Sequence, residues 1–271
     1  MDVSSTVRVP EQAVLDPIGV PPPEFERLHI LGAPVDVVDM PGALRFVDRC
    51  VREERPTCSI AAMNPEKVYS LRRSSRLRLF FESANLVLPD GIGIVLAARL
   101  LHGRGMHRVP GADVLQCICA AAPGRAYRIF VFGASEEINA AAVAKLRQHY
   151  RGINIVGRAN GYLRREENDA LVRAINDSRA DILFVALGSP RQEFWMLDNM
   201  SRLKVGICQG VGGALDTVAG KVKRAPQSWQ AVGCEWAYRL LHQPSRILRY
   251  AALLRFAVEL ALAKAAQVWK G

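Results

Sequence analysis

The sequence has no long uncharged apolar run. Such runs do not exceed 11 residues, as in the glycine-rich stretch Val205–Leu215, whereas about 20 residues are needed to span a bilayer. A polytopic membrane protein is therefore excluded. The first residues, Met1–Pro23, also lack the apolar core of a signal peptide, so the reducing cytosol is the expected compartment.

Metal-binding patterns are missing as well. The six cysteines form no C-x-x-C pair and the five histidines are scattered, so we expect no Cys/His metal cluster. The sequence contains no Asp-x-Asp, no G-x-G-x-x-G and no Walker motif. A nucleotide-sugar enzyme that holds a metal through Asp-x-Asp is therefore not expected. Any phosphate charge would have to be met by Arg, Lys and helix N-termini.

Positive charge is abundant but unevenly placed. The formal net charge is +10 over 271 residues. Residues 1–27 hold two Lys or Arg and five Asp or Glu, residues 28–220 hold 25 and 19, and residues 221–271 hold nine and two. A basic balance is compatible with nucleic acid, an anionic membrane surface or phosphorylated substrates.

From about residue 28, short apolar strands alternate with helical stretches. The predicted strands are Cys58–Met63, Asn85–Leu88, Arg128–Phe132, Asn154–Val156, Asp181–Leu187 and Lys204–Gln209. The predicted helices cover 65–83, 92–102, 111–121, 135–150, 166–178 and 190–200. Strands that are apolar throughout indicate burial on both faces, hence a parallel sheet covered by helices. The expected fold is α/β, a Rossmann-like, mostly parallel sheet flanked by helices with a helical C-terminal appendage.

Composition divides the chain into three parts. Residues 1–27 are rich in proline and acidic residues and are expected to form a disordered tail. Residues 28–224 form the α/β domain, which opens with two short strands within Ile30–Val38 and a helix from Pro41 to about Glu54. Residues 225–271 read as a basic helical appendage.

Ligands of open parallel sheets bind beyond the carboxyl ends of the strands, so the residues there are candidates. Asn64 follows the first strand, where it either caps a helix that begins with Pro65 or faces a ligand. Asp90 follows the second strand; it either caps the next helix or serves as a general base. Arg108, in a charged loop, either clamps phosphate or is simply solvated.

The later strands end in glycine-containing turns. Gly133 precedes a Ser135 cap, and this turn either is only a tight turn or lets backbone N–H groups approach an anion. Gly188, a Ser189 cap and Pro190 at the first helical position read as a helix start, which leaves the choice of Arg191 and Gln192 unexplained. The turn after the last strand suggests close backbone approach to a ligand, and its residues Gly212, Gly213 and Asp216 are candidates for that contact. Asp216 either binds a ribose hydroxyl or only favours the helix dipole.

Together these segments resemble the WecG/TagA/CpsF bacterial glycosyltransferases over roughly residues 28–256. The matching stretches are Asn64–Glu66, Leu88–Gly93, Arg108–Asp113, Phe132–Ala134, Gly161-Tyr162, Leu187–Glu193, Gly210–Asp216, Ala219–Pro226 and Glu235–Leu240. Each motif is weak alone, but nine in this order are specific.

The resemblance implies an inverting, metal-independent hexosyltransferase that needs no cofactor. It would move a sugar from a UDP-sugar to a polyprenyl-diphosphate-linked saccharide in surface or exopolysaccharide biosynthesis. Asp90 falls on the family's proposed base, Arg108 would neutralise the diphosphate, and Gln192 would orient donor or acceptor. Asp216 would hold the ribose. The glycines at 133, 188, 212 and 213 would let UDP lie against the backbone.

The resemblance also implies that the appendage docks on the inner face of a bacterial cell membrane, reached from the cytoplasm. Arg239, Arg246 and Arg249 match the family's arginines and are candidates to bind the lipid diphosphate. A solvated basic face and a self-association helix over Arg255–Trp269, giving a homo-oligomer, are the alternatives.

One position departs from the family. Ala62 stands where the family usually has threonine, so a hydroxyl contact in the active site is lost. UDP-glucose, UDP-N-acetylmannosamine and its uronate all remain compatible as donors.

Two other functions compete with the glycosyltransferase. A nucleic-acid-binding α/β protein is suggested by the basic run Arg72–Arg78, which lacks interleaved aromatic side chains; we expect no nucleic-acid partner. A non-catalytic nucleotide-binding scaffold would need neither Asp90 nor the basic appendage.

Overall fold

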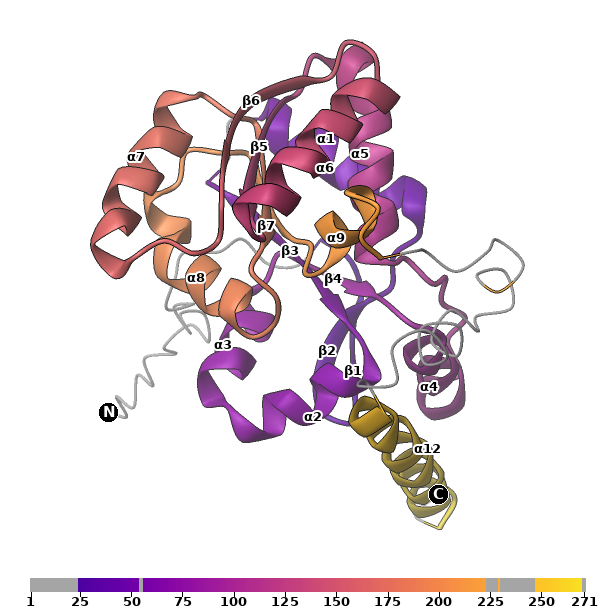
Figure 1. Cartoon of the computed structure of the whole chain (residues 1–271). Coiled ribbons are helices and arrows are strands. Elements are labelled where there is room, and N and C mark those ends of the chain that lie inside the picture. The colour runs from indigo at the N-terminus through magenta and orange to yellow at the C-terminus, as the bar shows by residue number, and fades with distance from the viewer. Residues whose placement is uncertain (1–23, 54–55, 223–228, 230–246, 270–271) are drawn as a thin grey trace, which may run out of the picture.

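Six parallel strands form the central sheet of the computed structural model, which describes residues 24–53, 56–222, 229 and 247–269 (Figure 1). The strands are β3 (Cys58–Met63), β4 (Leu86–Pro89), β5 (Arg128–Gly133), β6 (Asn154–Ala159), β7 (Ile182–Ala186) and β8 (Ile207–Gly210). Their spatial order is β4–β3–β8–β7–β5–β6. Strands β4, β7 and β8 are buried along their whole length, as a sheet covered on both faces requires. The predicted Rossmann-like α/β fold is confirmed.

Helices cover both faces of the sheet, and each layer closes its own apolar core. One layer consists of α1 (Met40–Arg52), α5 (Gly111–Arg125), α6 (Glu136–His149) and α9 (Ala214–Val218). The other consists of α2 (Pro65–Arg73), α3 (Ser75–Ser83), α4 (Ile92–His102), α7 (Asn168–Asp177), α8 (Arg191–Asn199) and α12 (Ile247–Val268). Short 3₁₀ turns, η1 (Arg165–Glu167) and η2 (Met200–Arg202), flank α7 and α8.

An antiparallel hairpin, β1 (Arg27–Ile30) and β2 (Ala33–Asp36), precedes the sheet. Its turn residues Leu31 and Gly32 have φ values of 50° and 82°, the left-handed pair that matches the twist of a two-residue hairpin. The body already begins before this hairpin, because the ring of Phe25 packs on Phe46 at 6.2 Å. The tail boundary expected at residue 27 is therefore too late, and residues 1–23 lie outside the described part.

The helix predicted over 65–83 is two helices. Ser74 has an extended backbone (φ −143°, ψ 107°), and its hydroxyl accepts a hydrogen bond from Leu77 N at 3.2 Å. Serine competes with the helix for backbone groups and is favoured at N-caps, so it ends α2 and starts α3.

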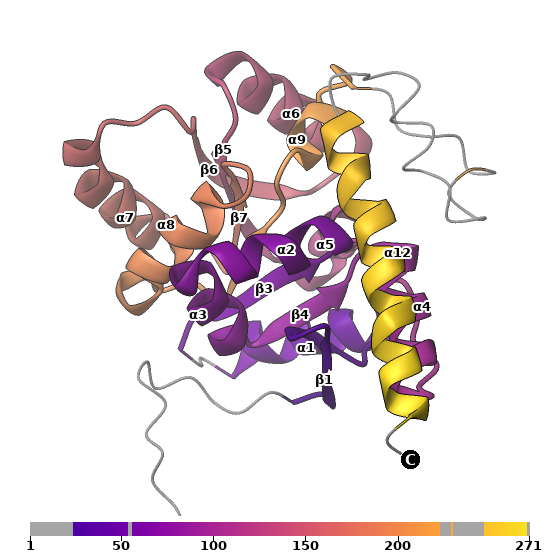
Figure 2. The ribbon, with the colours of Figure 1, turned by 90° about the horizontal axis from the view of Figure 1, so that it is seen from below.

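Helix α12 confirms a helical C-terminal segment, although residues 223–228 and 230–246 of the predicted appendage lie outside the description. The helix runs along α4 and also contacts α2 (Figure 2). Its own residues Phe256 and Leu260 are buried in the apolar core. Glu259 pairs with Arg72 of α2 at 2.7 Å and with Arg255 at 2.9 Å. Burial pushes the pKa of this carboxyl upward, but the two arginines outweigh it and the pKa is lowered.

Candidate functional site

The candidate site lies at the edge of the sheet where all six parallel strands end. β3 and β8 are neighbours in the sheet, yet the helices that follow them, α2 and α9, pack on opposite faces. Such a switch point opens a crevice between the two diverging connections, and ligands of open α/β sheets bind there. The residues on either side of this point are therefore considered as two groups.

On one side the structure brings Asn64, Asp90 and Arg108 together, here called the β3–β4 cluster. The backbone N–H of Asp90 donates to the carbonyl of the residue before Asn64 at 2.9 Å. The N–H of the residue after Arg108 donates to the carbonyl of the residue before Asp90, also at 2.9 Å. Segments that are far apart in the sequence are thus held at one strand end. Asp90 and Arg108 are both half-buried.

Capping explains Asn64 but not Asp90. Asn64 Oδ1 accepts from Lys67 N at 2.9 Å, so the N-cap alternative for Asn64 is confirmed. The N-cap of α4 is Gly91, with a φ of 108° and no side-chain capping bond. The alternative that Asp90 is the N-cap of this helix is therefore wrong.

On the other side of the switch point is a hollow of about 330 Å³, here called the glycine pocket. Four of the predicted residues line it: Gly188, Gly212, Gly213 and Asp216. Gly188 and Gly212 have φ values of 74° and 54°, a conformation that favours glycine. The turns after β7 and β8 thus line one hollow, and contact of these residues with a ligand stays a prediction.

Three polar residues of the glycine pocket were missed as candidates. Ser135, Tyr162 and Lys221 line it. Tyr162 is 75% exposed. Both Tyr162 and Lys221 lie in stretches that carry the family resemblance, which was the available signal. Ser135 also caps α6, accepting from Ile138 N at 3.3 Å.

Gly133 is explained by strand packing. A β-carbon there would lie 2.4 Å from the carbonyl oxygen of Ala186 on the neighbouring strand β7. The residue is buried and is not among those lining the glycine pocket. Its glycine is thus required for β5 and β7 to end side by side, with or without a ligand.

Arg191 and Gln192 have different surroundings at the start of α8. Arg191 is exposed and donates to the carbonyl of Gly161 at 3.3 Å. Gln192 is buried, and its Oε1 accepts from Gly212 N at 2.9 Å. Gln192 therefore supports the glycine pocket through its hydrogen bond to the backbone of Gly212. Ser189 does not cap α8 as expected, because the N-cap is Pro190 and lacks a side-chain bond.

Ala62, the departure from the family pattern, lies at the carboxyl end of β3 beside the start of α5. A β-carbon placed on Gly111 would come within 3.3 Å of Ala62 Cβ. Buried Gln209, on the neighbouring strand, donates from Nε2 to the carbonyl of Gly111 at 2.9 Å. Ala62 thus sits where the loop after Arg108 meets the sheet.

The predicted arginines of the appendage are only partly reached by the structure. Arg239 and Arg246 lie outside the described residues. Arg249 lies in α12, but its side chain is outside the description. Their contact with a lipid diphosphate stays a prediction.

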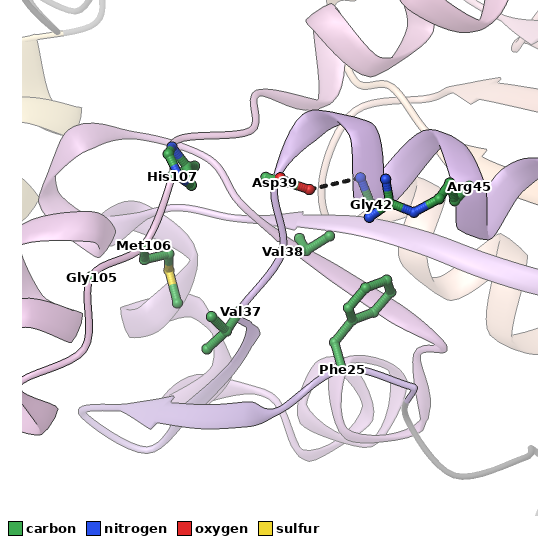
Figure 3. A pocket seen from close by; sticks show the side chains of 9 residues that line it. All are labelled: Phe25, Val37, Val38, Asp39, Gly42, Arg45, Gly105, Met106 and His107. Atoms are coloured by element: carbon green, nitrogen blue, oxygen red, sulfur yellow. Dashed lines mark hydrogen bonds between the residues drawn. The ribbon is translucent and has the colours of Figure 1, made fainter.

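A second hollow, of about 310 Å³, lies between the start of α1 and the loop 105–107 (Figure 3). Its polar lining includes Arg45 and His107. Asp39 is engaged in capping α1, accepting from Gly42 N at 2.7 Å. None of the predicted site residues lines this hollow, so it is not part of the candidate site.

The described residues were also compared with the requirements of a metal site and of a membrane-spanning helix. No group of three or more His, Cys, Asp or Glu among the described residues is placed to hold a metal ion, and metal independence stays a prediction. No helix in the part of the chain that the structure covers is both long and apolar enough to cross a bilayer.

In the basic run, Arg72 pairs with Glu259 and Arg76 with Asp198, so these two cations are neutralised within the protein.

A comparison with protein families gives a match over almost the whole chain. The family described as "Glycosyl transferase WecG/TagA/CpsF family" matches residues 28–269. The matched range contains the β3–β4 cluster, the glycine pocket and α12.

Proposed function

The chain belongs to the glycosyl transferase WecG/TagA/CpsF family, and from that membership we propose a specific reaction. The family makes it a glycosyltransferase of cell-surface polysaccharide biosynthesis, with a nucleotide-sugar donor and a lipid-linked acceptor. The proposed donor is a UDP-sugar carrying a hexose or N-acetylhexosamine-type sugar. The proposed acceptor is a saccharide on polyprenyl diphosphate.

The observation that carries the proposal is the glycine pocket at the switch point, lined by Gly188, Gly212, Gly213 and Asp216. A nucleoside diphosphate needs a surface for its base, a partner for its ribose and positive potential for its phosphates. Exposed Tyr162 offers a stacking face, Asp216 an acceptor for ribose hydroxyls, and Lys221 a cation. The helix N-termini of α6 and α8 add partial positive charge. Glu136, in the first turn of α6, is balanced by Arg158 at 2.6 Å.

The proposed reaction is a single displacement with inversion. Asp90 takes the proton of the acceptor hydroxyl as that oxygen forms a bond to the anomeric carbon of the sugar. The bond from the anomeric carbon to the diphosphate breaks on the opposite face, and UDP leaves with both bonding electrons. Arg108, hydrogen-bonded by its loop to the strand end of Asp90, stabilises the charge that develops on the diphosphate. Metal ions are not required in this scheme.

The surface of α12 supports binding to the membrane that holds the acceptor. Leu254, Val258 and Leu262 are 74%, 60% and 65% exposed and follow one another at intervals of four residues, so they lie along one side of the helix. Phe256 and Leu260 are buried in the protein. The helix therefore has a second apolar stripe, here called the α12 stripe, directed away from the core. We propose that it enters the membrane interface, aided by the basic residues of the C-terminal segment.

A screen of donors tests the proposal. The purified protein is incubated with a short-chain polyprenyl-diphosphate saccharide and one UDP-sugar at a time. The mass of the acceptor is then measured by mass spectrometry. We expect one UDP-sugar to add the mass of a single sugar with release of UDP, in the presence of EDTA as well. No mass gain from any UDP-hexose, UDP-N-acetylhexosamine or UDP-uronate, over acceptors of different saccharide lengths, would contradict the proposal.

A further inference from the structure

A buried ion pair lies behind the site and belongs to neither of its two groups. Lys67 Nζ is 2.9 Å from Glu193 Oε1, and the two side chains are 13% and 1% exposed. Lys67 also lies over the ring of Phe81, 5.2 Å from its centre, which keeps the ammonium inside the protein. A buried pair of this kind is often no more stabilising than a well-packed apolar pair. Stability alone therefore gives little reason for it.

The carboxylate of Glu193 has a second contact that is specific in direction. Its Oε1 also accepts from Gln192 Nε2 at 3.1 Å. A carboxylate accepts hydrogen bonds and cannot donate them, so the amide of Gln192 must present its nitrogen to Glu193. The amide oxygen is then left on the other side, where it accepts from Gly212 N at 2.9 Å. A reversed amide would lose both bonds at once.

The opposite end of the ion pair leads to the β3–β4 cluster. Lys67 lies in the first turn of α2, and its own N–H is bound by the side chain of Asn64. The residue before Asn64 accepts from Asp90 N. Hydrogen bonds and one ion pair thus connect the strand end that carries Asp90 with the loop that carries Gly212.

We propose that Glu193, whose charge Lys67 balances, is a positioning residue: it locks the Gln192 amide in one orientation and so holds the glycine pocket in register with Asp90. The inference deepens the proposed function, since it takes the glycine pocket to be the nucleotide site. It changes the role of Gln192, whose oxygen serves the protein backbone. Without the lock, the Gly212 loop loses the hydrogen bond that fixes its N–H, and the pocket loses its shape.

Two double variants separate the lock from the charge. Lys67→Met with Glu193→Gln removes both charges but keeps a carbonyl that accepts from Gln192. Lys67→Met with Glu193→Leu removes both charges and the acceptor. Neither leaves an unpaired buried charge, so we expect both to fold, with the leucine variant melting about 4–8 °C below the glutamine variant because Gln192 loses its bonds. Glu193→Asp, which keeps the charge but withdraws the carboxylate by one methylene, is the further variant if the leucine protein does not fold.

Two measurements compare these proteins. Hydrogen exchange of the unliganded protein follows the peptide that contains Gly212, and calorimetry measures UDP binding. With Glu193→Leu or Glu193→Asp we expect faster exchange at Gly212 and UDP binding weaker by about five- to thirtyfold, the loss of one to two hydrogen bonds. With Glu193→Gln both should stay within about twofold of the wild type.

The lock is overturned if the leucine and aspartate variants exchange at Gly212 and bind UDP as the wild type does, or if the glutamine variant is impaired as much as the leucine variant. Failure of the proposed function has a different signature. A wild-type protein that does not bind UDP contradicts the nucleotide site, while the exchange comparison, made without ligand, still decides whether Glu193 fixes the loop.

Discussion

Replacing Gly210 by alanine puts a methyl group against Gln192 and tests whether that side chain supports the site. The new Cβ would lie 2.7 Å from Gln192 Nε2 and 3.2 Å from its Cδ. The amide would have to retreat by about 0.7 Å to reach ordinary contact. Such a shift breaks or weakens its two bonds, to Gly212 N and to Glu193. Each is worth about 1 kcal/mol, so the free energy of unfolding falls by about 2 kcal/mol and the melting temperature by about 4–8 °C.

The discriminating result is the effect on nucleotide binding, measured by calorimetry with UDP beside thermal denaturation. Gly210→Ala should weaken UDP binding by about tenfold. Gly206→Ala is the control for destabilisation, because its Cβ would be 2.9 Å from the backbone of Val51, away from the site; it should lower the melting temperature and leave UDP affinity unchanged. Gly105→Ala meets no atom within 4 Å and should change neither. The reasoning is refuted if Gly210→Ala loses stability but binds UDP normally, or if Gly206→Ala weakens UDP binding equally.

Three further predictions concern the rest of the fold. A hydrogen bond from Arg125 is the main cause that lowers the pKa of Asp48 to about 2, against about 3.9 in an unfolded chain. The ionised form therefore stabilises the protein above about pH 4 and this contribution is lost as the pH falls towards 2; Asp48→Asn should melt earlier than wild type at neutral pH, with the gap closing in acid melts. Glu259→Gln removes the negative charge and replaces one of the two oxygens that accept from Arg72 and Arg255 by a donor, so hydrogen exchange in α12 should rise while exchange in the central sheet does not. Serine substitutions in the α12 stripe should reduce co-sedimentation with anionic vesicles several-fold, with the exposed Leu79→Ser of α3 as the unaffected control; equal binding of both proteins would count against the stripe. The stripe variant changes Leu254, Val258 and Leu262.

The architecture could be predicted because strands buried on both faces have a continuous apolar sequence. Ile182–Ala186 is apolar at every position and is buried throughout, so its place inside a two-sided sheet follows from composition alone. Since all the strands are parallel, the turns after them had to meet at one edge. That is why Asp90, Gly188 and Gly212 could be selected before their positions were known.

What could not be predicted depends on contacts between distant segments. Local rules assigned capping to Asp90 and Ser189, but α4 and α8 begin without a side-chain cap. Local rules left Gly133 open between a tight turn and an anion-binding turn, whereas the neighbouring strand requires a glycine there. The bond between Lys67 and Glu193 joins residues 126 positions apart, and no periodicity or motif in the sequence indicates such a pair.

The central claim is that Asp90 is the base of a UDP-sugar-dependent transfer to a lipid-linked acceptor. The most direct test is transfer of a radiolabelled sugar from its UDP-sugar to a polyprenyl-diphosphate saccharide, comparing wild type with Asp90→Asn at equal UDP occupancy measured by calorimetry. Asparagine keeps the shape but cannot take the proton, so we predict a rate at least about a hundredfold lower with UDP binding intact. An Asp90→Asn protein that transfers sugar at the wild-type rate would contradict the account.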